Sequence, residues 1–222
     1  MTIARLQALL NRTLPDARIE PLSLPGCGPM KLGLINADYA PGPLDPEVMR
    51  AVIREPAYWA FCWGSGLALA RYLTRHPTLV RGRRVVDLGS GSGVVAIAAA
   101  LAGADRVIAC DNDPDALMAT GINAELNGCR IELSDHLYRL PADNDLLLMA
   151  DVLYDAGNLP LLTAAKNLAD TLLVADSRIA RLPDPAFTLI DTIEARTCPN
   201  LGEFDEFRSA RLFHWGTPLE LH

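Results

Sequence analysis

Four carboxylates lie at or just after the ends of short apolar runs that have the pattern of buried strands: Asp87, Asp111, Asp135 and Asp151. In an open parallel sheet, ligands collect beyond the carboxyl ends of the strands, so residues at those ends are brought together. One acid at a helix start is ordinary capping. Four acids at equivalent positions instead predict a small-molecule site that binds hydroxyl and amine groups.

A glycine-rich turn, GSGSG at residues 89–93, follows the first of these runs. Glycines let the backbone approach a bound nucleotide, and the start of the helix behind them offers free N–H donors. Residues 91–96 also match the G-x-G-x-x-A dinucleotide fingerprint, which leaves an NAD-dependent oxidoreductase open. Asp111 does not discriminate between NAD and other nucleoside cofactors, because an acid after the second strand binds ribose hydroxyls. Asp87 argues against NAD, since a carboxylate faces a pyrophosphate unfavourably but orients an ammonium group.

The elements that must position these residues alternate between strand and helix from about residue 84 onward. The expected strands are 84–88, 106–110, 130–133, 145–150, 171–175, 187–195 and 206–215, with helices at 94–101, 113–126 and 158–169. This alternation predicts an α/β domain with a doubly wound, mainly parallel sheet. The last two strands lie close together without a long helix between them. We therefore expect them to form an antiparallel pair, which makes the seven-stranded sheet mixed.

Residues 1–80 are predicted to form an N-terminal cap on a core of residues 81–222, because they offer too little periodic apolar surface for a separate core. The cap is expected to contain a helix near residues 3–14, one from Asp45 with Pro46 in its first position, and one at 65–76. Between residues 15 and 46, seven prolines and four glycines limit regular structure to short pieces. This segment is interpreted as a lid or a substrate-facing surface.

Charge and composition exclude several classes of protein. The chain has 20 Lys and Arg against 27 Asp and Glu, a net charge of −7, which argues against binding to nucleic acid. The longest apolar run, 94–102, is well short of the ~20 residues of a membrane span. The five cysteines are widely spaced and include no Cys-x-x-Cys pair, so neither a disulfide framework nor a metal site is expected. With no secretion signal recognisable, a cytoplasmic location is expected.

Two sets of residues resemble a known family. The segment DLGSGSG at 87–93, with Asp111 after the second strand, resembles the cofactor signature of class I S-adenosylmethionine-dependent methyltransferases, whose fold is Rossmann-like. The segments YWAFCWGSG at 58–66 and DVLYD at 151–155 resemble the family-16 lysine methyltransferase group, particularly the electron-transfer-flavoprotein β-subunit lysine methyltransferases. The broad resemblance covers roughly residues 56–215.

This resemblance implies S-adenosyl-L-methionine as the cofactor and two groups of site residues. Asp87 would lie near the amino group of the cofactor, and Asp111 would hold the ribose hydroxyls. Asp151 and Tyr154 would form the catalytic group, facing the methyl sulfonium and the incoming nucleophile. The complete cofactor-binding group is Trp63, Asp87, Gly89, Gly91, Gly93, Asp111, Asn112 and Asp135.

The chemistry implied is methyl transfer to nitrogen. A sulfonium is already an activated methyl donor, so the protein has only to align an uncharged nucleophile and exclude water. The chain lacks the Asn-Pro-Pro-Tyr signature of amide and adenine-amine methyltransferases. The expected enzyme is therefore an N-methyltransferase whose partner is a protein with an accessible lysine. The alternatives are a small-amine (nicotinamide-like) methyltransferase, an NAD-binding oxidoreductase, and a catalytically silent binding module.

Overall fold

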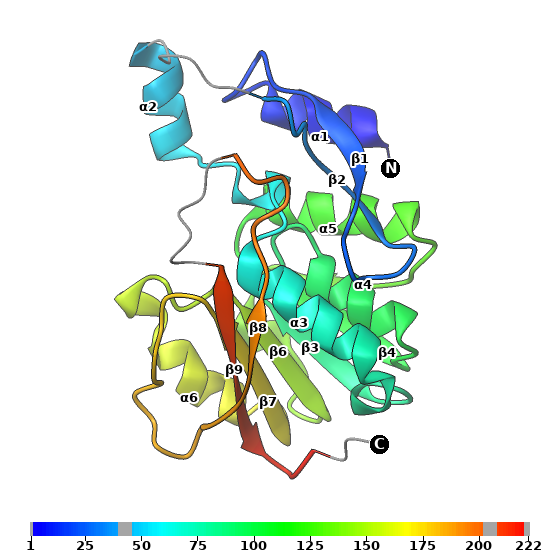
Figure 1. Ribbon diagram of the computed structural model, residues 1–222, viewed down its shortest axis with the longest axis vertical. Coiled ribbons are helices and arrows are strands. Elements are labelled where there is room, and N and C mark those ends of the chain that lie inside the picture. Colours follow the sequence, from blue (N-terminus) through cyan, green and yellow to red (C-terminus); the bar gives the residue numbers. More distant parts are fainter. Residues whose placement is uncertain (1, 40–45, 202–207, 220–222) are drawn as a thin grey trace.

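The computed structural model describes residues 2–39, 46–201 and 208–219 of the 222-residue chain. A seven-stranded sheet with the order β5-β4-β3-β6-β7-β9-β8 lies at its centre (Figure 1). The strands are β3 (Arg84–Leu88), β4 (Arg106–Cys110), β5 (Glu132–Ser134), β6 (Leu146–Ala150), β7 (Thr171–Asp176), β8 (Thr188–Glu194) and β9 (Ser209–Gly216).

The first five of these strands run parallel, and β9 pairs antiparallel with both β7 and β8. The predicted fold, a doubly wound mixed sheet with an antiparallel C-terminal pair, is confirmed. β5 lies one or two residues later than expected, and the expected start of the last strand at 206–207 lies outside the described residues.

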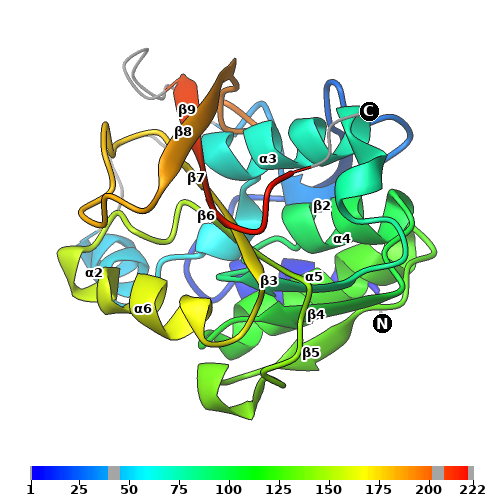
Figure 2. The same cartoon turned by 90° about the horizontal axis from the view of Figure 1, so that it is seen from below.

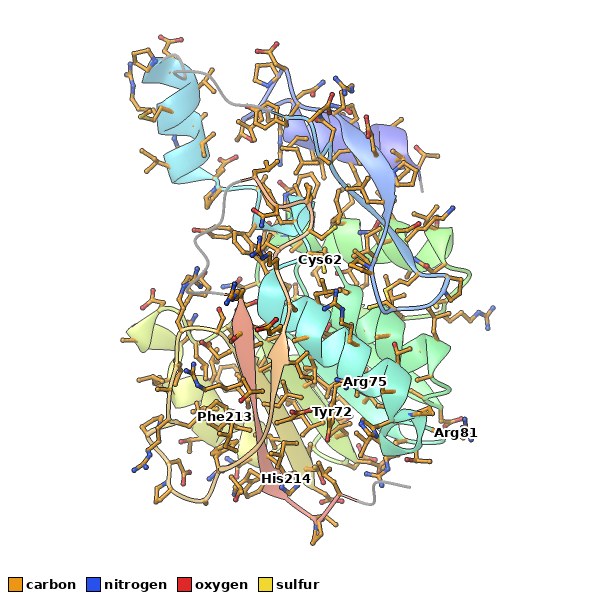
Figure 3. All side chains as sticks on the ribbon, in the orientation of Figure 1. Cys62, Tyr72, Arg75, Arg81, Phe213 and His214 are labelled. Atoms are coloured by element: carbon orange, nitrogen blue, oxygen red, sulfur yellow. The ribbon has the colours of Figure 1, made fainter. Side chains whose placement is uncertain are left out.

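Helices cover both faces of the sheet, with α3 and α4 on one side and α6 on the other (Figure 2). Alternate strand residues therefore point into two different cores: Val85 packs toward α3 and α4, and Val86 packs toward α6. Both residues are buried, as is usual for a parallel sheet between two helical layers. Side chains fill the space between the sheet and the helices (Figure 3). The core helices are α3 (Gly64–Arg75), α4 (Val94–Leu101), α5 (Pro114–Leu126) and α6 (Pro160–Lys166).

The Pro- and Gly-rich segment contains an antiparallel hairpin that the sequence analysis did not predict, formed by β1 (Ile19–Ser23) and β2 (Lys31–Ile35). Together with α1 (Ile3–Leu10), this hairpin packs on the side of α5 that faces away from the sheet (Figure 1). Each strand has five residues, which agrees with the expectation of short pieces.

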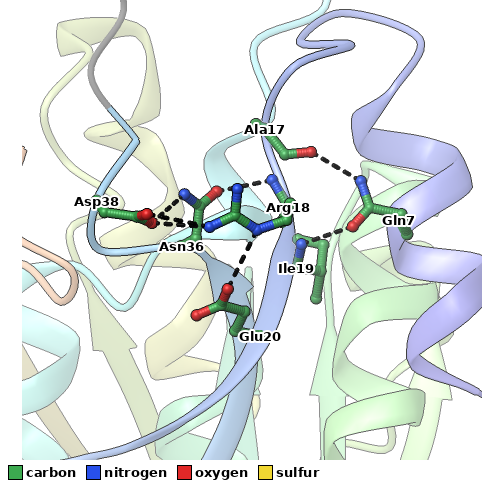
Figure 4. A network of polar contacts seen from close by, with 7 residues as sticks. All are labelled: Gln7, Ala17, Arg18, Ile19, Glu20, Asn36 and Asp38. Carbon is green, nitrogen blue, oxygen red and sulfur yellow. Dashed lines mark hydrogen bonds and ion pairs between the residues drawn. The ribbon is translucent and has the colours of Figure 1, made fainter.

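Gln7 of α1 joins the helix to the beginning of this hairpin. Its side-chain amide donates to the carbonyl of Ala17 at 2.8 Å and accepts from the backbone N–H of Ile19 at 2.7 Å (Figure 4). On the neighbouring strand end, the Asn36 side chain accepts from the N–H of Arg18 at 2.7 Å. These contacts satisfy backbone groups that a hairpin leaves unpaired at its open end.

A short helix, α2 (Pro46–Arg54), precedes the core, and no residue of it is buried. Pro46 is its first residue, as predicted, while the expected cap Asp45 lies outside the described residues. The described residues also form single helical turns between these elements: η1 (Tyr58–Ala60), η2 (Pro77–Leu79), η3 (Leu137–Arg139) and η4 (Ala156–Asn158). In the described ranges, no helix has the length and apolar character needed to cross a bilayer.

Candidate active site

A cavity of about 360 Å³ lies beyond the carboxyl ends of β3, β4 and β6. The chain leaves β3 toward β4 and β5 on one side and continues through β6 and β7 on the other, so this is the point where the strand order reverses. Doubly wound sheets bind ligands at that point. The lining residues are Tyr58, Trp59, Trp63, Gly89, Gly91, Asp111, Asn112, Asp113, Ala116, Ala150, Asp151, Val152, Tyr154, Asn158 and Arg178.

Asp111 holds the glycine turn in place. Its carboxylate accepts from the backbone N–H of Gly91 at 2.9 Å and from that of Asp113 at 3.0 Å, one bond on each oxygen. Burial raises the pKa of Asp111, and these two backbone hydrogen bonds oppose that rise. Gly91 has a φ of +52°, and no atom lies within 4 Å of the position that a Cβ would take. The turn thus leaves open space beside a fixed carboxylate.

Asp87 lies below this turn and is 1% exposed. Its carboxylate accepts from the backbone N–H of Ala96, in the first turn of α4, at 2.9 Å. Burial raises the pKa of Asp87 to about 7, with a further contribution from the nearby Asp111. Asp87 does not line the cavity, so in this structure its carboxylate connects β3 to α4.

The raised pKa of Asp87 predicts a pH dependence of stability. Between about pH 4 and pH 7 the unfolded chain has released this proton while the folded protein retains it. The free energy of unfolding therefore falls as pH rises through this window. Asp87→Asn removes the titration, so the fall in the free energy of unfolding across this window should be smaller by on the order of 4 kcal/mol.

Urea unfolding at several pH values between 4 and 7.5 measures this effect. Asp105→Asn, which removes an exposed carboxylate, is the matched control. Parallel curves for the wild type and Asp87→Asn would show that burial of Asp87 does not shift its titration.

Asp151 joins the end of β6 to the beginning of α3. Its carboxylate accepts from the backbone N–H of Ser65 at 2.9 Å and from the Ser65 hydroxyl at 2.6 Å. Burial raises the pKa of Asp151 to about 6, and the Ser65 hydroxyl opposes that rise. Asp151 also has a φ of +54°, in the left-handed region that non-glycine residues rarely adopt. Such backbone strain clusters at functional sites.

Aromatic side chains form the wall of the cavity next to Asp151. Tyr58 makes edge-on contacts with Trp63, at 5.8 Å between ring centroids, and with Tyr154, at 6.2 Å. The Trp63 indole N–H donates to the carbonyl of Tyr58 at 2.9 Å, which fixes the indole ring. Tyr58 and Tyr154 are 49% and 53% exposed, so they stand at the mouth of the cavity.

The structure brings seven of the ten site residues expected from the sequence to this cavity: Trp63, Gly89, Gly91, Asp111, Asn112, Asp151 and Tyr154. Three others do not line it. Asp87 is buried below the turn, Gly93 packs against Thr120, and the Asp135 carboxylate pairs with the Arg139 guanidinium at 2.6 Å on the surface. The binding and catalytic roles of all ten stay predictions.

Several lining residues were not predicted as site residues from the sequence, among them the polar residues Asp113, Asn158 and Arg178. Arg178 comes two residues after β7. Its position just after a strand end is the same signal that identifies Asp111 and Asp151. Asn158 donates to the carbonyl of Val152 at 2.8 Å and so closes the loop that carries Tyr154. Within the described ranges, no three His, Cys, Asp or Glu side chains gather in a way that could hold a metal ion.

The fold and the position of the cavity define a structural class, the Rossmann-like fold of S-adenosylmethionine-dependent methyltransferases. The solved magnesium protoporphyrin IX methyltransferase of Synechocystis PCC 6803, with bound S-adenosylmethionine, superposes with a TM-score of 0.53. That match covers 79% of this chain and 86% of the other at 17% sequence identity, so it concerns the fold alone. The family model of ribosomal protein L11 methyltransferase matches residues 71–156.

Within that class, the chain is similar to the electron transfer flavoprotein β subunit lysine methyltransferases. It is 47% identical to the human protein over 103 residues, which are 44% of this chain and 38% of the human one. It is 32% identical to the Xenopus laevis protein over 160 residues, 64% of this chain and 65% of the other. The matches thus span less than two thirds of the length of these relatives. The resemblance drawn from residues 58–66, 87–93 and 151–155 is confirmed.

Proposed function

We propose that the protein is an S-adenosylmethionine-dependent N-methyltransferase that methylates a lysine side chain of another protein. One observation carries the proposal. At the switch point of the sheet, a single cavity has the glycine turn and Asp111 on one side and Asp151 with Tyr58 and Tyr154 on the other. The similarity to lysine methyltransferases supports the same activity.

The residues around the glycine turn fit the nucleoside part of the cofactor. A volume of about 360 Å³ falls within the ~300–1,000 Å³ usual for small-molecule sites. Each oxygen of Asp111 accepts one backbone N–H and keeps capacity for another donor, as a pair of ribose hydroxyls requires. Asn112 and Ala116 line the same end and would lie beside a base.

The opposite end of the cavity suits an alkylamine. S-adenosylmethionine supplies a methyl group that its sulfonium already activates. The face of an aromatic ring attracts a cation, so Tyr58 and Tyr154 would guide a lysine ammonium into the mouth. Removal of water around the amine lowers its pKa and favours the neutral nucleophile. Asp151 favours the charged form instead, so its carboxylate serves to bind and orient the amine as it arrives.

The contacts of Asp151 support a positioning role. Both of its oxygens accept hydrogen bonds from Ser65, so the carboxylate is held rigidly at the N-terminus of α3. A rigidly held carboxylate would bind an incoming amine at one fixed place in the cavity. Alignment of two reactants in this manner contributes up to ~7–11 kcal/mol to catalysis in favourable cases.

Calorimetric titration of the full chain with S-adenosylhomocysteine tests the proposal. We expect one binding site per chain, with micromolar affinity or tighter. Failure of the folded protein to bind S-adenosylhomocysteine would overturn the proposed function. Binding of NADH in the same cavity would instead favour the oxidoreductase alternative.

The acceptor is tested separately. We expect tritium to pass from labelled S-adenosylmethionine into recombinant electron transfer flavoprotein β subunit, the acceptor that the names of the relatives suggest. Label in nicotinamide-like amines and in no protein would favour the small-molecule alternative. The exposed tyrosines at the mouth favour a protein, because such a mouth admits a side chain that projects from a large surface.

Three further points belong to this proposal. A cytoplasmic location agrees with five cysteines that are all free thiols. A partner other than nucleic acid agrees with the net charge of −7. Residues 1–80 as a cap on a core of 81–222 remain the proposed division of the chain, with α3 as the part of the cap that packs directly against the central sheet.

A further inference from the structure

Helix α5 and its C-cap residue carry three polar side chains on one face: Thr120 and Asn123 in the helix and Asn127 at the C-cap. Their spacing of three and four residues places them in a row along the helix. Thr120 and Asn123 are both fully buried, with 0% of each residue exposed. Buried polar groups persist in folded proteins when hydrogen bonds satisfy them, so the partners of this row are informative.

The Thr120 hydroxyl contacts the glycine turn. It lies 3.1 Å from the Ser90 hydroxyl and 3.2 Å from the carbonyl of Gly91. Asn127, at the other end of the row, contacts the hairpin. It accepts from the N–H of Lys31 at 3.0 Å and donates to the carbonyl of the same residue at 2.6 Å.

Asn123 contacts both. Its side-chain amide donates to the carbonyl of Ser92 in the glycine turn at 2.9 Å, and its oxygen accepts from the N–H of Gly33 in β2 at 2.7 Å. A Cβ on Gly33 would lie 2.8 Å from the end of the Ile3 side chain in α1 and 3.3 Å from the Asn123 oxygen in α5, so a glycine at this position leaves room for β2 between the two helices. One buried amide thus joins two segments that are far apart in sequence.

The turn that Asn123 holds is also the turn that lines the cavity. Ser92 directly follows Gly91, whose N–H is held by Asp111 and whose backbone faces the open space of the site. The Asn123 amide therefore holds the turn at the carbonyl of Ser92, while Asp111 holds it at the N–H of Gly91. Loss of the Asn123 side chain would leave a backbone carbonyl of the turn and a backbone N–H of the hairpin unpaired in a buried place.

We infer that Asn123 is a positioning residue for the cofactor and that it couples the hairpin of residues 19–35 to the glycine turn. The inference rests on the proposed function, since it assigns the turn to S-adenosylmethionine. The hairpin is then a support for the cofactor turn rather than the lid interpreted from the sequence. Because coupling between two sites is reciprocal, occupancy of the cavity must also stabilise the hairpin.

Two measurements on the full chain test this inference: the Kd for S-adenosylhomocysteine and hydrogen exchange of the 31–35 amides with and without saturating S-adenosylhomocysteine. In the wild type we expect S-adenosylhomocysteine to slow exchange at 31–35 at least fivefold. Asn123→Ala should raise the Kd about tenfold and abolish this slowing. Asn127→Ala is the matched control, because it removes the hairpin contacts of Asn127 and a bond to the Asn123 backbone carbonyl but leaves both side-chain bonds of Asn123 and the turn in place. It should raise basal exchange at 31–35 but keep the Kd within twofold.

Asn123→Leu keeps the approximate volume of the side chain and loses both the donor to Ser92 and the acceptor for Gly33, so it serves if Asn123→Ala does not fold. It should also raise the Kd about tenfold. A Kd within twofold of the wild type in the Asn123 variants, or an equal rise in Asn127→Ala, would overturn the coupling. A wild type that does not bind S-adenosylhomocysteine contradicts the proposed function itself and is recognised before any variant is made.

Discussion

Asp111→Ala should weaken binding of S-adenosylhomocysteine about 100-fold. The carboxylate accepts from the N–H groups of Gly91 and Asp113, so its removal leaves two partly buried donors unpaired and frees the glycine turn. Hydrogen bonds to a charged acceptor contribute ~1.5–3 kcal/mol each. A combined loss of about 3 kcal/mol corresponds to roughly 100-fold in Kd.

The matched series for this position contains one conservative and one distant substitution. Asp111→Asn keeps a single acceptor oxygen and should weaken binding about tenfold. Asp143→Asn changes an exposed carboxylate that pairs with Arg84 at the amino ends of the strands, opposite the cavity, and it should bind like the wild type. Calorimetry on all three variants provides the comparison. Equal Kd values for Asp111→Ala and Asp143→Asn would place the cofactor elsewhere.

Asp151→Asn should lower kcat about 100-fold while changing the Kd for S-adenosylhomocysteine by less than threefold. Asparagine tolerates the left-handed φ of +54° at this position, so the backbone is preserved. The variant loses the negative charge beside the acceptor, and its NH₂ group cannot accept from Ser65. The variant would then attract the lysine amine less strongly than the wild type and align it less well.

Methyl transfer to the recombinant electron transfer flavoprotein β subunit measures this effect. Ser65→Ala removes one donor to Asp151 and keeps the charge, so we expect a loss of kcat of only about three- to tenfold. Asp155→Asn makes the same charge change in the same loop, at a residue that does not line the cavity, and should keep its activity. A normal kcat in Asp151→Asn would refute the role assigned to Asp151.

Much of the cavity was predictable because its residues come at repeated places in a simple pattern. Asp111 and Asp151 each follow an apolar strand, and the glycine turn begins directly after β3. Because strands and helices alternate, the strands run parallel and their carboxyl ends lie together on one side of the molecule. The same rule applied to β7 leads to Arg178, which lines the cavity.

The position of Asp87 shows the limit of that rule. A residue near the end of a strand points to one face of the sheet or the other. The Asp87 side chain points to the face where the backbone N–H of Ala96 in α4 lies, beneath the glycine turn. Asp135 likewise follows a strand, but β5 is at the edge of the sheet, and the carboxylate pairs with Arg139 on the surface. Distance from the switch point therefore separates Asp135 from Asp111 and Asp151, whereas the direction of its side chain separates Asp87 from them.

The sequence by itself determined the α/β class, the glycine turn and the acids at the strand ends, because period, turn chemistry and capping act over a few residues. Only the tertiary structure decided which long-range partners these residues have. Ser65 holds Asp151 across 86 positions, and Asn123 joins the hairpin at Gly33 to the turn at Ser92. Such contacts depend on how separate helices and strands pack, and no local pattern encodes that packing.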